Sequence, residues 1–463
     1  IKDRNPFPSA CGRVCPHACE AQCRRSLVDA PVAINHVKRF AADWDLEREQ
    51  PWIPAILPAT GKRIAIVGAG PSGLSAAFYA AAAGHQVTVF ERQPEAGGMM
   101  RYGIPEYRLP KAVLDAEIAT ITALGVQIQC GKSLGTHLRL EDLQADFDAV
   151  YLAIGSWIPT PMNIEGENSD GVWTGIRYLE QVVKGKDPEP GDTVVVVGGG
   201  NTAIDCARTA LRRGAKRVIL LYRRTRDEMP AEPHEVSDAE AEGVELRFLA
   251  APTAIHTEAG GLVLRCLEMT LGEPDRSGRR RPIPVEGSDF EISTSMVIGA
   301  IGQSTNTQFL YNDLPVRLNK WGDIDVDGST MTASEPKIFA GGDCVTGPAT
   351  VIEAVAAGRR AAWAMDQFVT KGYVRGEPAA YNCSRGSLED LPRDEFEARP
   401  KLVRHPMPSV PVAERVTGFG QVETGYTEAD ARAAQRLHHR LGVGGVAKIE
   451  ARRRHAAELR TVL

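Results

Sequence analysis

Four cysteines near the start of the chain are the residues whose spacing points most directly to chemistry. Cys11, Cys15, Cys19 and Cys23 are spaced as C-x3-C-x3-C-x3-C, whereas the other five cysteines lie far apart. Zinc sites favour paired C-x2-C units, which this segment lacks, while four thiolates suit the soft iron of an iron–sulfur cluster. Pro16 argues against one continuous helix through the segment. We therefore expect metal ligands here, and the alternative is four buried helical cysteines.

A glycine-rich motif marks a first nucleotide site. Residues 68–73 read G-x-G-x-x-G between a predicted strand, RIAIVGAG, and an alanine-rich helix. This motif lets the backbone approach a pyrophosphate that the helix N-terminus then faces. Glu91 ends the next predicted strand roughly 20 residues further on, at the position that binds ribose hydroxyls. The candidate contacts in the motif are Gly68, Gly70, Pro71, Ser72 and Gly73.

A second copy of the same unit has a different charge at the ribose position. Gly198 and Gly200 belong to a glycine turn between the strand DTVVVVGGG and the helix NTAIDCARTALRRG. No carboxylate ends the following strand, and Arg223 and Arg224 come next. Guanidinium groups bind a 2′-phosphate that a carboxylate would repel, so this copy is predicted to prefer NADPH over NADH. The alternative is a solvated run of charge.

A third glycine turn lies in GGDCVTGPATVIEAVAAG, where a strand gives way to a helix. Gly342 and Asp343 occupy the turn. The Asp343 carboxylate is placed to bind a ribityl hydroxyl while the helix dipole faces a flavin or its phosphates. Together with Glu91 this arrangement predicts FAD at the first site. The alternative for Asp343 is an ordinary acid at a helix N-terminus.

These motifs predict an α/β fold with two Rossmann-like dinucleotide-binding domains that follow the Cys-rich segment. The two βαβ units form an internal repeat. The predicted domains are a Cys-rich helical segment, an FAD-binding domain in two pieces, an NADPH-binding domain and a C-terminal extension, over residues 1–55, 56–175 with 305–370, 176–304 and 371–463.

Composition excludes several classes of protein. The 463 residues carry 54 Lys and Arg against 59 Asp and Glu, a net charge of −5, so a strongly basic nucleic-acid binder is excluded. A hydrophobic content of 43% excludes a disordered chain. Residues 64–83 are uncharged and long enough to span a bilayer, but glycines and a proline in the middle favour strand, turn and buried helix. With no secretory signal visible, we expect a cytoplasmic protein without nucleic-acid or membrane partners.

The motifs together resemble a known family. CGRVCPHACE, GAGPSG, ERQPEAGGMMRYGIPEYRLP, GGGNTAIDC, YRRTRDEMPA and GGDCVTGPATVIEAVAAGR are similar to the small (β) subunit of NADPH-dependent glutamate synthase. They are also similar to the N-terminal half of dihydropyrimidine dehydrogenase. The resemblance covers residues 5 to about 370. It implies a small α-helical iron–sulfur domain followed by two interleaved Rossmann-like dinucleotide-binding domains, with FAD, NADPH and [4Fe–4S] clusters. It implies further FAD contacts at Gly98, Arg108, Leu134 and Thr350, and NADPH contacts at Asn201, Thr202, Arg223, Arg224 and residues 300–302.

The function that this resemblance implies is electron entry. NADPH would give hydride to FAD, and electrons would pass through iron–sulfur clusters to a partner such as a glutamate synthase large subunit-like protein. Relatives carry further cysteines before the NPFP segment, which are missing here, so we expect a first domain cut at its start that holds iron poorly. A disulfide reductase would need a redox cysteine pair, and Cys206 has no neighbour at C-x2-C spacing. The other alternative is a truncated paralogue that acts as an FAD-binding scaffold.

Overall fold

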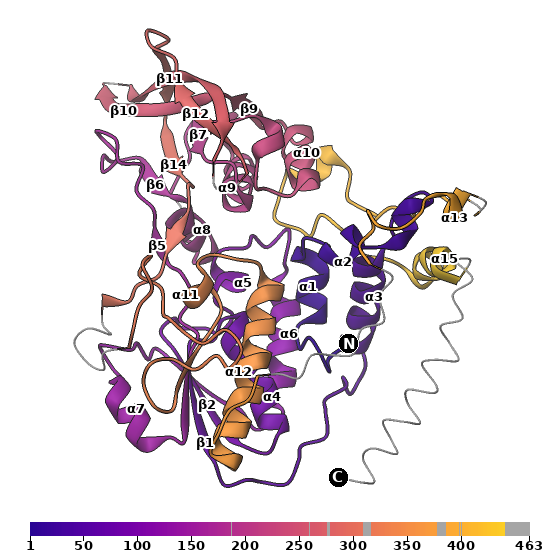
Figure 1. Cartoon of the computed structure of the whole chain (residues 1–463). Coiled ribbons are helices and arrows are strands. Elements are labelled where there is room, and N and C mark those ends of the chain that lie inside the picture. Colours follow the sequence, from indigo (N-terminus) through magenta and orange to yellow (C-terminus); the bar gives the residue numbers. More distant parts are fainter. Residues whose placement is uncertain are drawn as a thin grey trace.

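Two α/β domains and a smaller helical domain make up the computed structural model (Figure 1). Placement is described for residues 1–439 except 187, 259, 276–277, 309–315, 377–385, 398 and 400. Cys383 and the basic end of the predicted C-terminal extension lie outside these residues. Within the described part of the chain, no helix combines the length and apolar character needed to cross a membrane.

The first α/β domain is built on a five-stranded parallel sheet in the order β16-β4-β1-β2-β3. Its strands are β1 (Arg63–Val67), β2 (Gln86–Glu91), β3 (Gln127–Cys130), β4 (Ala149–Leu152) and β16 (Ile338–Ala340). Its helices are α4 (Pro71–Ala82), α5 (Met99–Tyr102), α6 (Lys111–Thr122), α7 (Leu140–Asp146), α11 (Asp343–Thr346) and α12 (Val351–Lys371). The glycine and alanine surfaces of α4 and α12 allow close packing: a Cβ on Gly358 would lie 2.0 Å from the Ser72 carbonyl oxygen.

The second α/β domain repeats this plan with a parallel sheet in the order β6-β14-β7-β8-β9. Its strands are β6 (Val172–Thr174), β7 (Thr193–Val197), β8 (Arg217–Tyr222), β9 (Glu245–Phe248) and β14 (Met296–Gly299). Its helices are α8 (Gly175–Val183), α9 (Asn201–Arg212), the 3-10 turn Arg226–Glu228 and α10 (Pro233–Ala241). Because β6 joins this sheet, the second domain starts slightly before the boundary at 176 expected from the sequence.

An antiparallel sheet is inserted into the second domain. It contains β10 (Ala250–Glu258), β11 (Gly261–Pro274), β12 (Arg280–Pro284) and β13 (Phe290–Thr294), and β11 pairs with each of the other three. The chain crosses between the two domains twice. The two crossings pair as a short antiparallel ladder of β5 (Ile158–Pro159) and β15 (Gln303–Ser304). The two α/β domains are therefore interleaved, as the resemblance implies.

The N-terminal domain is helical and is held from two sides. It contains α1 (Pro8–Val14), α2 (Ala18–Ala21), the 3-10 turn Arg24–Leu27 and α3 (Ile34–Leu46). On one side, the buried Glu117 carboxylate of α6 accepts hydrogen bonds from the backbone N–H groups of Ser9 (2.6 Å) and Ala10 (2.9 Å). This carboxylate satisfies two donors at the start of α1 that no intrahelical partner can reach. It fixes the cysteine segment to the first α/β domain.

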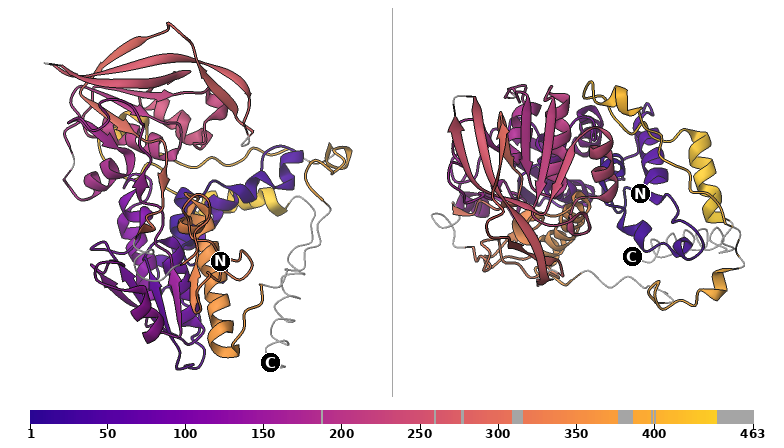
Figure 2. Two further views of the ribbon diagram at one scale, coloured as in Figure 1. Left: turned by 60° about the vertical axis from the view of Figure 1, so that its left-hand side comes forward. Right: turned by 90° about the horizontal axis from the view of Figure 1, so that it is seen from above.

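The C-terminal segment lies along the other side of the N-terminal domain (Figure 2). Its helices are α13 (Asp394–Glu397), α14 (Val412–Arg415) and α15 (Glu428–His439). Arg39 on α3 donates to the backbone oxygen of Glu423 at 2.7 Å, and Arg404 donates to Glu20 at 2.7 Å. Arg415 reaches Glu242 at the end of α10 at 3.0 Å. We call residues 401–439 the strap, because they connect the N-terminal domain to the second α/β domain.

Candidate functional site

The first glycine turn forms one wall of a pocket at the carboxyl ends of the first sheet. Gly68 has a φ of +107°, a conformation that favours glycine. A Cβ on Gly73 would lie 1.9 Å from the Gly68 carbonyl oxygen, so the third glycine lets α4 approach the turn. Gly68, Gly70, Pro71 and Ser72 line the pocket, whereas Gly73 supports the turn from behind. The backbone and the N-terminus of α4 are therefore open to a phosphate group.

Glu91 ends β2 beside this turn, as the spacing predicts. Its side chain is 5% exposed and lines the pocket. One carboxylate oxygen accepts from the Ala69 N–H at 2.7 Å and the other from the Gln93 N–H at 2.8 Å. The carboxylate thus holds the glycine turn in shape while it lines the pocket.

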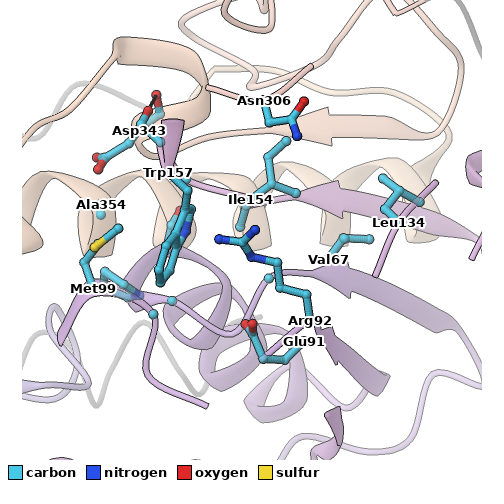
Figure 3. Close-up of a pocket in the computed structure, with 18 of the residues that line it drawn as sticks. Val67, Glu91, Arg92, Met99, Leu134, Ile154, Trp157, Asn306, Asp343 and Ala354 are labelled. Carbon is cyan, nitrogen blue, oxygen red and sulfur yellow. Dashed lines mark hydrogen bonds between the residues drawn. The ribbon is translucent and has the colours of Figure 1, made fainter. Parts of the chain in front are cut away.

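Asp343 and Glu91 lie on opposite sides of the pocket, with Trp157 between them (Figure 3). Asp343 begins α11, and burial raises the pKa of its carboxyl group to about 7. The Arg92 guanidinium points into the pocket and lies 4.4 Å from the centre of the Trp157 ring. A pocket with acidic groups at both sides and a cation in the middle fits an extended dinucleotide with a central pyrophosphate.

The remaining residues expected at the FAD site fall into two groups. Gly98, Leu134 and Thr350 line the pocket, and a Cβ on Gly98 would lie 2.7 Å from the Gly70 Cα, so only glycine fits this wall. Gly342 has a φ of +77° and directly precedes Asp343, which also lines the pocket. Arg108 is not among the lining residues. Its guanidinium lies 2.8 Å from both Asp205 and Glu235 of the second domain, so here it joins the two domains.

The second glycine turn lines a second pocket with Arg223 and Arg224. Gly198, Gly200 and Thr202 take part, as do residues 300–302 at the end of β14. Asn201 does not line the pocket; its side-chain oxygen accepts from the Glu232 N–H at 3.0 Å. Of the two arginines, Arg223 is exposed, whereas Arg224 is 4% exposed and paired with Asp275 at 2.9 Å. The two therefore have different surroundings.

The two pockets meet at a shared boundary. Trp157 lines the first pocket and Pro159 the second. In the loop before α12, Pro348 lines the second pocket and Ala349 the first. Groups bound in the two pockets would therefore approach each other at this boundary.

The four clustered cysteines do not gather into a closed metal site. Cys11 is buried on α1, Cys19 is exposed on α2, and Cys15 and Cys23 lie at helix ends with partial exposure. Burial raises the pKa of the Cys11 thiol to about 12. Among the described residues, no three His, Cys, Asp or Glu side chains form a set able to hold a metal ion. The thiols suit iron chemically, but by their placement they supply only part of a ligand set.

Sequence reasoning missed Arg92, Trp157 and Arg279, which all line the pockets. Arg92 directly follows Glu91, so the end of β2 was a usable signal. Trp157 and Arg279 have no such signal, because only the crossing of the chain and the pairing of β11 with β12 bring them to their pockets.

Comparison with known families supports this division of the chain. The pyridine nucleotide-disulphide oxidoreductase family matches residues 61–358. The family described as dihydropyrimidine dehydrogenase domain II, 4Fe-4S cluster, matches residues 1–50. The expected combination of nucleotide-binding domains with an iron–sulfur domain is confirmed.

Three relatives and one solved structure illustrate the similarity. The chain is 43% identical to the NADP(+)-dependent formate dehydrogenase subunit beta of Moorella thermoacetica, over 94% of this chain and 65% of that protein. It is 41% identical to the NADPH-Fe(3+) oxidoreductase subunit beta of Geobacter sulfurreducens, over 80% and 59%. It is 36% identical to the glutamate synthase [NADPH] small chain of Escherichia coli, over 77% and 80%. The chain thus spans less than two thirds of the first two relatives.

Among solved structures, FprA of Mycobacterium tuberculosis in complex with NADPH shares the fold. It matches with a TM-score of 0.57 at 20% identity, over 69% of this chain and 87% of that chain. At this identity the likeness concerns the fold alone.

Proposed function

We propose that this chain, which belongs to the pyridine nucleotide-disulphide oxidoreductase family, is an NADPH-dependent flavoprotein that passes electrons onward. The chain binds FAD in the first pocket and NADPH in the second, and it delivers electrons from NADPH to a partner subunit or acceptor. FAD, when bound, supplies the hydride-accepting chemistry. The observation that carries the proposal is the boundary at Pro348 and Ala349, where neighbouring residues line both pockets.

The residues of the chain bind and orient the two dinucleotides. Glu91 faces the ribose and braces the glycine turn, and the N-terminus of α4 faces the pyrophosphate. Arg223 lines the second pocket from an exposed position, where its guanidinium can pair with a 2′-phosphate. The chain supplies position and electrostatics, so a Ser–His–Asp set or a general base is not required for this reaction.

The cysteine segment is where we place iron. The match of residues 1–50 to a 4Fe-4S domain and the soft thiolate donors support this placement. The relatives named as a subunit beta or a small chain support a partner that receives the electrons.

The experiment is reduction of an artificial one-electron acceptor by FAD-loaded protein and NADPH. We expect turnover with NADPH and little with NADH. Cys15→Ser should leave reduction of the flavin by NADPH intact, since that step belongs to the α/β domains. A protein that binds FAD but reduces no acceptor would instead support the scaffold alternative.

A further inference from the structure

The hairpin of β11 and β12 brings a third arginine to the second pocket. The two strands pair in antiparallel fashion, with Thr270 opposite Ile283 and Pro274 opposite Arg280. Arg279 directly precedes β12, is partly buried and lines the pocket together with Arg223 and Arg224. These residues reach the pocket from separate parts of the sequence, since the hairpin follows β8 by some fifty residues.

The Arg224 side chain donates two hydrogen bonds to the β11–β12 hairpin. Its Nε donates to the backbone oxygen of Arg280 at 2.7 Å, and its Nη2 donates to the Asp275 carboxylate at 2.9 Å. With 4% exposure and a carboxylate beside it, its charge is largely neutralised locally. Arg226, two residues further on, is paired with Glu240 on α10. Of the arginines after β8, Arg223 is therefore the one placed to meet an anion in the pocket.

Asp275 contacts both Arg224 and Arg279. Its backbone N–H donates to the Arg279 carbonyl oxygen at 2.8 Å, which joins the backbone just after β11 to the backbone just before β12. The same residue that accepts from Arg224 thus fixes the backbone of Arg279. From these contacts we infer that Arg279 and Arg223 bind the 2′-phosphate of NADPH, and that Arg224 is a positioning residue that holds the hairpin over the pocket.

This inference rests on the proposed function and refines its coenzyme choice. A phosphate shared by two guanidinium groups from separate elements gains charge-assisted hydrogen bonds from both. Loss of one such group should weaken phosphate binding about tenfold to a hundredfold. A ligand without the 2′-phosphate should be unaffected, because Arg279 would have no partner on it.

The test is calorimetric titration of the purified full chain with 2′,5′-ADP and, separately, with 5′-AMP, which lacks the 2′-phosphate. Arg279→Gln should raise the Kd for 2′,5′-ADP about tenfold to a hundredfold and leave 5′-AMP unchanged. The matched control is Arg281→Gln, an exposed arginine on β12 that is absent from the pocket lining. It should change neither Kd.

The variant Arg224→Gln distinguishes the positioning role that we infer for Arg224 from the phosphate contact that we infer for Arg279. It should weaken 2′,5′-ADP binding and also speed amide hydrogen exchange in residues 278–284, whereas Arg279→Gln should leave that exchange unchanged. One outcome would refute the inference alone: the unmodified chain binds 2′,5′-ADP more tightly than 5′-AMP, but Arg279→Gln binds 2′,5′-ADP as tightly as the Arg281→Gln control does. In that case the assignment of NADPH to the second pocket still stands. If the unmodified chain does not prefer 2′,5′-ADP over 5′-AMP, both are wrong.

Discussion

The buried Glu91 carboxylate both stabilises the glycine turn and lines the first pocket. Two backbone N–H groups occupy its two oxygens, so the glycine turn depends on the negative charge even before a ligand arrives. A carboxylate in such a position retains lone pairs for further donors. The same carboxylate is thus available to ribose hydroxyls without being released from the turn.

We predict that Glu91→Ala weakens retention of FAD. The loss of charge-assisted hydrogen bonds from the ribose hydroxyls to this carboxylate should cost about 1.5–3 kcal/mol, or about tenfold to a hundredfold in affinity. The measurement is flavin content after dialysis, with the flavin identified chromatographically. The unmodified protein should release FAD rather than FMN, which lacks the adenosine ribose that we propose Glu91 binds. Release of FMN would refute the assignment of this pocket.

Because the pKa of the Asp343 carboxyl group is raised, we predict that the stability of the FAD-free protein depends on pH. Burial raises the pKa of its carboxyl group from 3.8 to about 7. Between these values the folded chain holds a proton that the unfolded chain has lost, so this group makes the free energy of unfolding fall as pH rises, by up to about 1.4 kcal/mol per pH unit. Asp343→Asn should remove this contribution.

The check is urea unfolding of both proteins from pH 4 to pH 8. The stability difference between variant and unmodified protein should grow in favour of the variant across this range. A constant difference would show that the Asp343 pKa is not raised.

At the scale of elements, an ionic cluster joins the two α/β domains. Arg108, from the loop between α5 and α6, pairs with Asp205 on α9 and Glu235 on α10. Arg208 of α9 lies between Glu235 and Glu242, and its guanidinium is 4.9 Å from the Tyr107 ring. All five charged side chains of this cluster are at most 11% exposed, so each depends on the others for its charge partner.

We predict that Arg108→Met lowers the thermal midpoint strongly. The change removes the arginine paired with the buried Asp205 carboxylate and one of the two arginines paired with Glu235, and breaking such a buried pair typically costs about 3–5 kcal/mol. The matched control is Arg217→Met, which breaks an exposed pair with Glu245 and should cost at most about 1 kcal/mol. Calorimetry of both variants makes the comparison. Equal shifts in the thermal midpoint of the two variants would mean that Arg108 does not hold the domains together. If Arg108→Met instead loses FAD without losing stability, the result would favour the FAD contact that the resemblance implies for Arg108.

The sequence predicted the elements that local pattern encodes. Both glycine turns, the Glu91 strand end and the GGDC turn lie where the periodicity of strands and helices indicates, because each is specified within about 30 residues. The partners of Arg108 and Arg224 could not be found this way. Asp205 and Asp275 are distant in sequence, and only the packing of α9 and the β11–β12 hairpin brings them close.

At the scale of the whole molecule, the strap has a structural role that the sequence pattern did not predict. Tyr426 packs edge-on against His36 of α3 with ring centres 5.4 Å apart, and its hydroxyl donates to the His405 carbonyl oxygen at 2.6 Å. Ala431 and Ala434 of α15 are buried beside it. The strap therefore covers the helical domain that carries the cysteines.

We predict that Tyr426→Ala loosens the strap. The lost ring contacts and hydrogen bond should expose residues 401–439 to limited proteolysis, with cleavage several times faster than in the unmodified protein. Tyr373→Ala is the control, because Tyr373 is 48% exposed and its loss should not change the cleavage rate. Mass spectrometry of the fragments locates the cut. Cleavage confined to other loops would show that Tyr426 does not secure the strap.

The central claim is that NADPH bound in the second pocket reduces FAD bound in the first. The measurement is an anaerobic titration of FAD-loaded protein with NADPH, followed by the absorbance of the oxidised flavin. We predict that about one equivalent of NADPH removes this absorbance, and that NADH does so far more slowly because Arg223 and its neighbours favour the 2′-phosphate. A flavin that stays oxidised under excess NADPH, or that NADH reduces equally fast, would contradict the account.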